Sequence, residues 1–309
     1  GKNGTLTDDS LNKLLNKLLE NEPLAIGLDF YRNYKSKVPE LTNILKNNNS
    51  IFAVCKAPID ENDKGIDPPP ELINSPERVG FSDILQGEEV ILRRQFLSHD
   101  PGNSKSKCQS KNSLSLKLAR SYLASTQKKG KNQEAFDSNR DLQDLIINGV
   151  ILQQLKNPDT GGYRGIDDGG YQILLDYRSF CQNNKSNCSP YNVAARKFSL
   201  EEVLKKNLLT KEDVNGKIVL IGIADNSYAN DYVNTPYTEK SQEGMPGFIV
   251  QAQMVSYLLR IALGEQSQLR VLSFGYESLW ILAWSLMGGI LAQLYKSPRR
   301  LIISQGVAL

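Results

Sequence analysis

Two short apolar runs decide the fold: Leu24-Ala25-Ile26-Gly27-Leu28-Asp29-Phe30 and Ile51-Phe52-Ala53-Val54-Cys55. Each has the length of a buried strand, and residues 41–46 between them have the pattern of a short helix. A strand, a helix and a second strand at this spacing predict a parallel βαβ unit.

Further elements of both kinds lie on either side of this unit. Thr7 is a capping residue in front of a leucine stripe at helical spacing, and Ser113 and Ser199 open two more helices. The run Lys217–Ala224 is the strongest strand, and a mostly apolar helix follows Pro246. We therefore expect an α/β fold, with a mixed, partly parallel sheet flanked by helices and followed by a C-terminal transmembrane helix.

Three more runs have the composition of strands. Residues 79–83 and 90–97 lie on either side of the turn Gln86-Gly87-Glu88-Glu89, which predicts an antiparallel hairpin. The turn Asp167-Asp168-Gly169-Gly170 leads into the third strand, residues 171–178.

A membrane segment is predicted near the C-terminal end. Residues 278–294 carry no charge, and with Tyr276 and Tyr295 the segment is long enough to cross a bilayer. The basic turn 296–300 follows, and a second apolar run begins at Leu301. We expect the chain to lie in the cell inner membrane. The positive-inside rule then places this turn in the cytoplasm and residues 1 to about 275 outside it. A buried helix of a soluble protein is the alternative.

The chain is therefore expected to have two regions. We expect an extracytoplasmic sensory domain over residues 1–268 and a transmembrane region over 269–309. The first membrane helix is expected at about 276–295 and the start of a second from 301. Since the chain begins with Gly1 rather than Met, we expect a fragment or a processed product.

Composition argues against several classes of function. The formal net charge is +3, with basic residues spread along the chain, so no nucleic-acid partner is expected. His99 is the one histidine, and no glycine-rich phosphate motif occurs, so we expect no cofactor and no catalytic residue. Asp60, Asn62, Gly65 and Glu71 have the spacing of a calcium loop, but Lys64 occupies a ligand position, so no metal is expected either.

The four cysteines predict disulfides if the domain is exported. Cys181 and Cys188 enclose a short polar loop and are natural partners, which leaves Cys55 to pair with Cys108. Four free thiols are the alternative if the domain is cytoplasmic.

Short motifs in a fixed order resemble the CHASE type-two domain, an extracellular sensory module of bacterial receptors. The motifs run nearly from end to end of the chain: Ile26–Phe30, Gly80–Asp83, Leu92–Arg94, Ser113–Leu116, Ile173–Arg178, Gly216–Gly222, Asp231, Thr235–Tyr237 and Met245–Gly247. The resemblance implies an anchor helix before the sensory domain, membrane helices after it and a cytoplasmic output such as a kinase or cyclase. It supplies no ligand that can be carried over to individual residues.

Polar residues after two strands suggest where a ligand binds. In open α/β sheets, ligands favour the loops past the carboxyl ends of the strands. One group follows the first strand and the other follows the strand 218–224. The candidate ligand-binding residues are Asp29, Tyr31, Arg32, Asp225, Asp231, Thr235 and Tyr237. Their carboxylates, hydroxyls, aromatic rings and one guanidinium suit a small polar molecule. The alternative is that Asp29 and Asp231 cap helices or fix loops.

We therefore expect a non-enzymatic, extracytoplasmic ligand-sensing domain of a bacterial transmembrane receptor. Its expected partners are a small-molecule ligand, the membrane and a second copy of the chain in a homodimer. Two alternatives remain open: an extracytoplasmic hydrolase that uses paired carboxylates such as Asp29 and Asp231, and a membrane-anchored protein-interaction module.

Overall fold

The computed structural model describes residues 6–58, 63–84, 91–102, 106–126, 145–163, 165–178, 194–224, 232–238 and 244–294. The chain divides into two compact units. The first comprises Gly1–Gln154 and Gly169–Leu269, and the second comprises Leu155–Asp168 and Arg270–Leu309. The division into domains at residue 268 stays a prediction.

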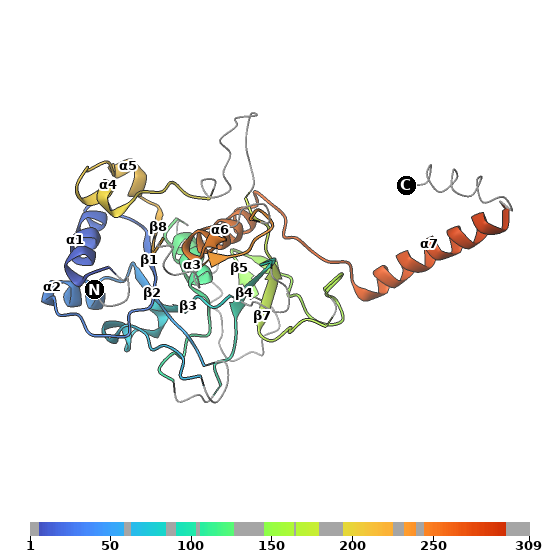
Figure 1. The fold of residues 1–309 in the computed structure, drawn as a ribbon, viewed down its shortest axis with the longest axis horizontal. Helices are drawn as coiled ribbons and strands as arrows, with labels where there is room; N and C mark the ends of the chain where they lie inside the picture. The colour runs from blue at the N-terminus through green and yellow to red at the C-terminus, as the bar shows by residue number, and fades with distance from the viewer. Residues whose placement is uncertain are drawn as a thin grey trace. The chain divides into compact units, whose positions relative to one another are not determined.

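A parallel sheet of four strands forms the centre of the first unit (Figure 1). Each strand is a short apolar run, as the sequence predicts for strands buried between helices. Their order across the sheet is β3 (Val79–Phe81), β2 (Ile51–Cys55), β1 (Ala25–Asp29) and β8 (Ile218–Gly222). The helix α2 (Pro39–Asn47) connects β1 to β2, so the predicted βαβ unit is confirmed.

The predicted antiparallel hairpin of residues 79–83 and 90–97 is wrong. β3 pairs in parallel with β2, whereas β4 (Arg94–Ser98) pairs antiparallel with β7 (Tyr171–Leu174). Gly80 gives part of the reason: a Cβ there would lie 2.6 Å from the backbone of Leu114, so a glycine allows β3 to pass close under the next helix. β3 is thereby part of the central sheet, and β4 belongs to a separate two-stranded ribbon.

Helices cover both faces of the parallel sheet. Because side chains alternate along a strand, Ile26 and Leu28 of β1 pack with α1 (Asp8–Leu19) and α2 on one face. Ala25 packs on the other face with α3 (Leu114–Thr126) and α6 (Gly247–Ala262). The predicted α/β fold with helices flanking the sheet is therefore confirmed, and the first unit has three layers.

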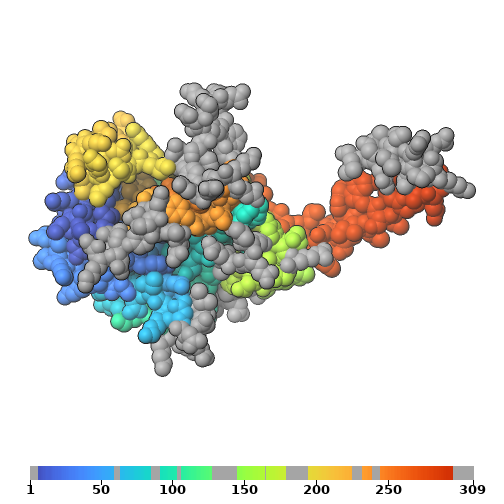
Figure 2. Space-filling view, viewed as in Figure 1, coloured from blue at the N-terminus to red at the C-terminus, as the bar shows by residue number. Residues whose placement is uncertain are grey.

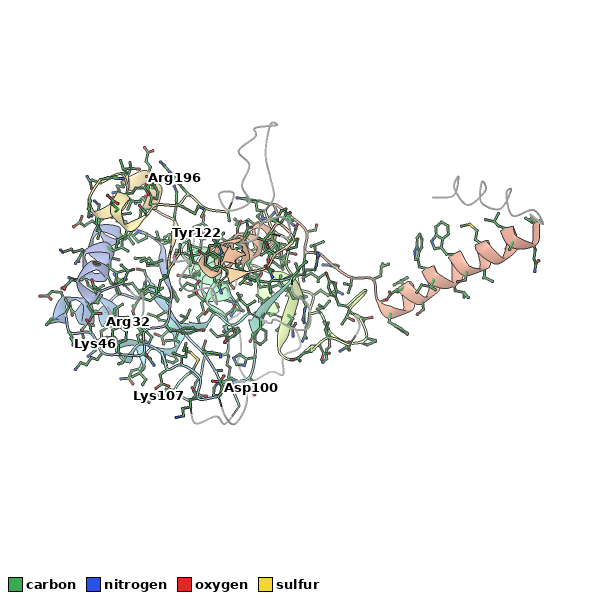
Figure 3. The ribbon with its side chains drawn as sticks, in the orientation of Figure 1. Arg32, Lys46, Asp100, Lys107, Tyr122 and Arg196 are labelled. Carbon is green, nitrogen blue, oxygen red and sulfur yellow. A yellow bond between two sulfur atoms is a disulfide. The ribbon has the colours of Figure 1, made fainter. Side chains whose placement is uncertain are left out.

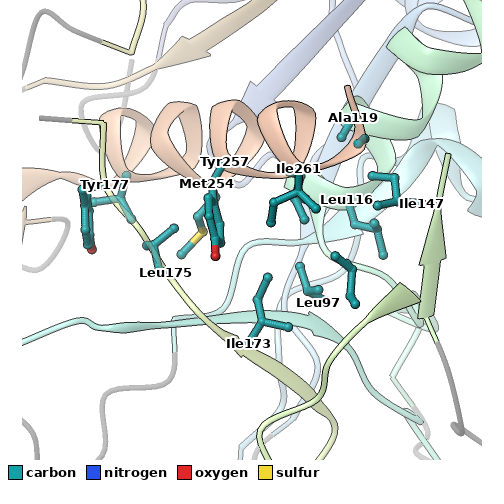
Figure 4. Close-up of a cluster of buried hydrophobic side chains, with 14 of the residues drawn as sticks. Leu97, Leu116, Ala119, Ile147, Ile173, Leu175, Tyr177, Met254, Tyr257 and Ile261 are labelled. Carbon is teal, nitrogen blue, oxygen red and sulfur yellow. The ribbon is translucent and has the colours of Figure 1, made fainter. Parts of the chain in front are cut away.

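A second hydrophobic core lies between these helices and the antiparallel ribbons. In Figure 4, Met254, Tyr257 and Ile261 of α6 point towards Ile173 and Leu175 of the β7 segment. The hairpin of β5 (Leu145–Ile147) and β6 (Val150–Leu152) adds its inward-facing side chains to the same core. The remaining short elements are η1 (Pro70–Leu72), η2 (Pro76–Arg78), α4 (Leu200–Leu204), α5 (Lys211–Val214), β9 (Tyr232–Val233) and β10 (Met245–Pro246).

The predicted helix caps are present. The hydroxyl of Thr7 accepts a hydrogen bond from the Ser10 N–H at the start of α1, and Ser113 accepts one from the Leu116 N–H at the start of α3. Ser199 and Glu202 form a reciprocal capping box at the start of α4. These local interactions fix where each helix begins.

A disulfide joins Cys55 to Cys108, with the two Cα atoms 5.6 Å apart. Cys55 is the last residue of β2, so the bond ties the carboxyl end of a central strand to the segment before α3. This confirms one predicted pair. Cys181 and Cys188 lie outside the described residues, so their pairing stays a prediction.

The second unit contains the helix α7 (Phe274–Leu294), close to the predicted span at 276–295. Among the described residues it is the one helix long and apolar enough to cross a membrane, and none of its residues is buried. The carboxylate of Asp159 accepts a hydrogen bond from the Phe274 N–H at 2.6 Å, which ties the 155–168 loop to the first turn of this helix. The second predicted span, from Leu301, lies outside the described residues.

Candidate functional site at the carboxyl edge of the sheet

The four parallel strands all end at one edge of the sheet, and polar side chains follow these ends. Asp29, the last residue of β1, pairs in register with Gly222, the last residue of β8. β2 and β3 end at Cys55 and Phe81, which also pair with each other. The residues that come directly after these four positions therefore meet at the carboxyl edge, where open α/β sheets bind ligands.

Asp29 and Tyr31 lie at this edge, as the sequence predicts. Both are half-buried, and each takes part in an interaction of its own. The hydroxyl of Tyr31 accepts a long hydrogen bond from the Ser82 hydroxyl at 3.5 Å. The loop after β1 therefore approaches the loop after β3, although β2 separates the two strands within the sheet.

Asp83 is a second carboxylate at the edge, and the sequence reasoning missed it. Burial raises its pKa to about 6, although nearby Lys56 acts in the opposite direction, and Asp63 raises the pKa further. Lys56 follows the end of β2 and forms an ion pair with Asp63 at 3.3 Å. A carboxyl group with such a pKa takes up or releases a proton near neutral pH, which is common at binding sites.

The sequence signal that places Asp83 and Lys56 at this edge is the one that placed Asp29 there. Lys56 comes directly after β2, and Ser82 and Asp83 come directly after β3. The hairpin prediction concealed this signal, because it made residues 79–83 an antiparallel strand whose end has no special position. With β3 parallel to β2, both segments contribute to the same edge.

Arg32, another predicted ligand-binding residue, is buried and forms ion pairs with two carboxylates. Figure 3 labels its position in the first unit. Its guanidinium donates to Asp8 at 2.8 Å, to Glu71 at 3.2 Å and to the carbonyl oxygen of Tyr34 at 3.1 Å. Glu71 also accepts the Ser36 N–H at 2.8 Å. These contacts join the start of α1, the loop after β1 and η1.

The electrostatics around Asp8 favour its charged form. Burial alone would raise the pKa of Asp8, but hydrogen bonds from the Arg32 guanidinium, the Lys37 N–H and the Ser36 hydroxyl hold it below its usual value. Glu71, weighed above as a calcium ligand, is a partner of Arg32, whereas Asp60 and Asn62 lie outside the described residues. An anionic ligand at Arg32 would compete with two carboxylates that are already in place, and this role of Arg32 stays a prediction.

Thr235 and Tyr237 lie in a turn that packs on the second core. The Thr235 N–H donates to the Thr238 hydroxyl at 2.7 Å, and the ring of Tyr237 contacts that of Tyr177, with centroids 5.9 Å apart. Asp225 and Asp231 lie outside the described residues. The structure thus brings Asp29 and Tyr31 to one edge and gives Arg32, Thr235 and Tyr237 other close partners.

The edge offers polar recognition by carboxylates, hydroxyls and one lysine. Among the described residues, no group of three His, Cys, Asp or Glu side chains lies close enough together to hold a metal ion. The hydrolase alternative proposed paired carboxylates such as Asp29 and Asp231. Asp231 lies outside the described residues, so this alternative remains untested.

One known domain family matches a region of the chain that includes both the sheet and most of the apolar helix. The CHASE2 domain matches residues 2–290. The chain belongs to the CHASE2 domain family. CHASE2 domains are extracellular sensory domains without catalytic activity of their own, so the resemblance inferred from the motifs is confirmed. No curated protein and no solved structure is found to match the chain.

Family membership and α7 together indicate the setting of the domain. An extracellular sensory module with an apolar helix of 21 residues indicates a membrane-anchored protein whose sensory domain lies outside. The carboxyl edge of the CHASE2 sheet is thus a candidate for the surface at which a signal is received.

Proposed function

We propose that this CHASE2 domain binds a small polar molecule outside the cell and passes the event through membrane helices to a cytoplasmic output. The observation that carries the proposal is the match to a sensory family over residues 2–290, which includes both the α/β unit and most of α7. In this arrangement the chain lies in the inner membrane, with residues 1 to about 275 outside and the turn 296–300 in the cytoplasm.

We place the ligand at the carboxyl edge of the sheet. Asp29, Tyr31, Ser82 and Asp83 supply acceptors and donors there, and Lys56 supplies a cation. The half-buried Asp83 supports this choice, because a carboxylate that is costly to bury is retained more readily where a ligand compensates it. Arg32, Asp225, Asp231, Thr235 and Tyr237 remain proposed contributors.

The helix α6 offers a path from this edge towards the membrane. Its first turn packs against the end of β8, since a Cβ on Gly222 would collide with the side chain of Phe248. Its 16 residues give a length of about 24 Å at the usual rise of a helix. A displacement of the residues at the carboxyl edge would move α6 as a rigid body, because packed helices transmit displacement better than loops do.

The link after α6 is held firmly to the first unit. The side-chain amide of Gln268 bonds both backbone groups of Gln153, at 2.7 and 2.8 Å, and the Leu269 N–H donates to the Tyr257 hydroxyl at 2.8 Å. Gln266 bonds Asp176 and Arg260. A movement of α6 would therefore displace residue 269 as well, because these hydrogen bonds keep the link after α6 from moving independently.

The test is a ligand screen on the full chain in lipid nanodiscs, read by thermal unfolding. A molecule that binds the edge should raise the midpoint of the wild-type protein, and this rise should be lost in Asp29→Ala and in Asp83→Ala. The matched control is Glu20→Ala, an exposed carboxylate at the end of α1, which should keep the full response.

Each other outcome has a defined meaning. An unchanged rise in both edge variants would overturn the edge as the ligand site. Steady turnover of generic ester, phosphate or glycoside substrates would contradict a sensor without enzymatic activity and favour the hydrolase alternative. Crosslinks between copies that do not change with any binding ligand would favour a static interaction module.

A further inference from the structure

The β5–β6 hairpin exposes apolar side chains on its outer face. Ile146 and Ile151 pair directly across the two strands, and both are exposed, with Ile151 at 52%. Their sequence neighbours Leu145, Ile147 and Leu152 face the second core and are buried. Two adjacent isoleucines on a solvent-facing ribbon are costly in water, which indicates that something covers them.

Two exposed leucines belong to the same corner of the first unit. The side-chain amide of Asn148, in the turn of the hairpin, donates to the carbonyl oxygen of Ala262 at 2.7 Å, next to Leu263. The pairing of Gln268 with Gln153 holds Leu269 near the other end of the hairpin. Leu263 and Leu269 are each about half exposed. We call Ile146, Ile151, Leu263 and Leu269 the hairpin patch.

The chain keeps this patch near the membrane. Leu269 and Phe274, where α7 begins, are five positions apart, and even a fully extended chain of that length spans only about 17 Å. This limit holds for any arrangement of the two units, because it follows from connectivity alone. Leu272 and Phe274 within the connection are exposed as well, and Arg270 beside them is suited to lipid phosphates.

We propose that the outer leaflet of the bilayer covers the hairpin patch. The apolar side chains would enter the interfacial region, which suits an exposed aliphatic surface held within reach of a membrane-spanning helix. The contact fixes the C-terminal end of α6 at the membrane surface, so that a movement of this helix acts on α7 from a defined position. This lipid contact rests on the proposed function in one respect only, because both require α7 to span the membrane.

The experiment uses tryptophan fluorescence in nanodiscs that contain brominated phospholipids. The chain has two tryptophans, Trp280 and Trp284, both in α7, so Trp280→Phe with Trp284→Phe gives a background without them. Ile151→Trp then places a single probe in the patch. Leu208→Trp is the matched control, because Leu208 is 51% exposed and lies between α4 and α5, at the other end of the first unit from β5 (Figures 1 and 2).

We expect bromine near the headgroups to quench the probe at 151 several-fold more than the probe at 208. No quenching at 151, or equal quenching at both positions, would overturn the proposal. A blue-shifted probe at 151 without quenching would show that a second copy covers the patch, and discs that hold one chain check this. If Ile151→Trp lowers the unfolding midpoint, Ile146→Trp replaces it.

The readout distinguishes this proposal from ligand sensing. It needs no ligand, so a failure of quenching leaves the sensing proposal intact. Equally, a screen that finds no ligand leaves the quenching result unaffected.

Discussion

Asp83 is the residue whose ionisation should be most visible in stability. Its pKa is about 6 in the folded protein against 3.8 for an ordinary aspartate, so the folded state binds the proton more tightly than the unfolded chain. Folding is therefore penalised above pH 6, and the penalty disappears as the pH falls towards 4. Asp83→Asn should raise the unfolding free energy by about 1–3 kcal/mol at pH 7.5, since each unit of pKa corresponds to about 1.4 kcal/mol.

Thermal unfolding across pH 4–8 checks this expectation. The difference between Asp83→Asn and wild type should shrink below pH 5. Asp100→Asn is the control, because it makes the same chemical change at an exposed aspartate and should shift the midpoint little. A stability difference that does not vary with pH would contradict the assignment.

The Cys55–Cys108 disulfide should stabilise the unit by restricting its unfolded chain. The two residues are 53 positions apart, and closing a loop of that size contributes about 4 kcal/mol in the chain-entropy estimate. Cys108→Ser should lower the unfolding free energy by an amount of that order, and reductant should bring the wild type close to the variant. A further shift of the variant in reductant would report on Cys181 and Cys188, while an unchanged midpoint in Cys108→Ser would show that the bond does not form.

At the level of single residues, the sequence was informative where the cause was local. Thr7 and Ser199 predict helix starts because a cap needs only the next three residues. Asp29 could be placed at the carboxyl edge because it ends a strand whose direction is fixed by the βαβ unit. The two carboxylates around Arg32 could not be predicted, since Asp8 and Glu71 are separated from it by 24 and 39 positions.

Among the elements, the pairings of β3 and of β4 were the ones that the sequence concealed. Residues 79–83 and 90–97 both have strand composition and have a turn between them, so a hairpin was the natural prediction. The true partner of β4 is β7, more than 70 residues further along the chain, and no local pattern encodes a pairing over that distance. The same error removed Asp83 from the predicted site.

The close approach of β3 to α3 requires a residue without a side chain at position 80. A Cβ at this position would meet the N and Cα atoms of Leu114 at 2.6 Å, and a backbone cannot move away as a flexible side chain can. Gly80→Ala should therefore lower the unfolding free energy by about 1–3 kcal/mol through overpacking. Gly162→Ala is the control, because no atom lies within 4 Å of its added Cβ. Equal midpoints for the two variants in thermal unfolding would show that β3 does not pack under α3 in this way.

For the whole molecule, the loop 155–168 gives α7 a second connection besides the link from α6. The Asp159 carboxylate satisfies the Phe274 N–H, and a Cβ on Gly161 would touch Val271 at 3.1 Å, so loop and helix are closely packed within the second unit. The loop continues into β6 and β7 at its two ends. The loop is thus a second covalent connection between the antiparallel ribbons and the unit that contains α7.

The orientation of α7 in the membrane can be tested with phosphatase fusions. The phosphatase is fused after residue 269 or after residue 300, and the chain is directed to the export machinery of a bacterial cell. The phosphatase is active only outside the cytoplasm. The fusion after Leu269 should be active and the fusion after Arg300 inactive, because α7 stops transfer and Lys296, Arg299 and Arg300 stay in the cytoplasm.

The control weakens the span and leaves the basic turn intact. Arginine near the centre of a spanning helix costs about 2.5–3.5 kcal/mol for each residue, so Leu282→Arg with Leu286→Arg should prevent α7 from stopping transfer. The fusion after Arg300 should then become as active as the fusion after Leu269. High activity after Arg300 in the unmodified chain would instead place α7 outside the bilayer, and the role of the hairpin patch as a lipid contact would fail with it.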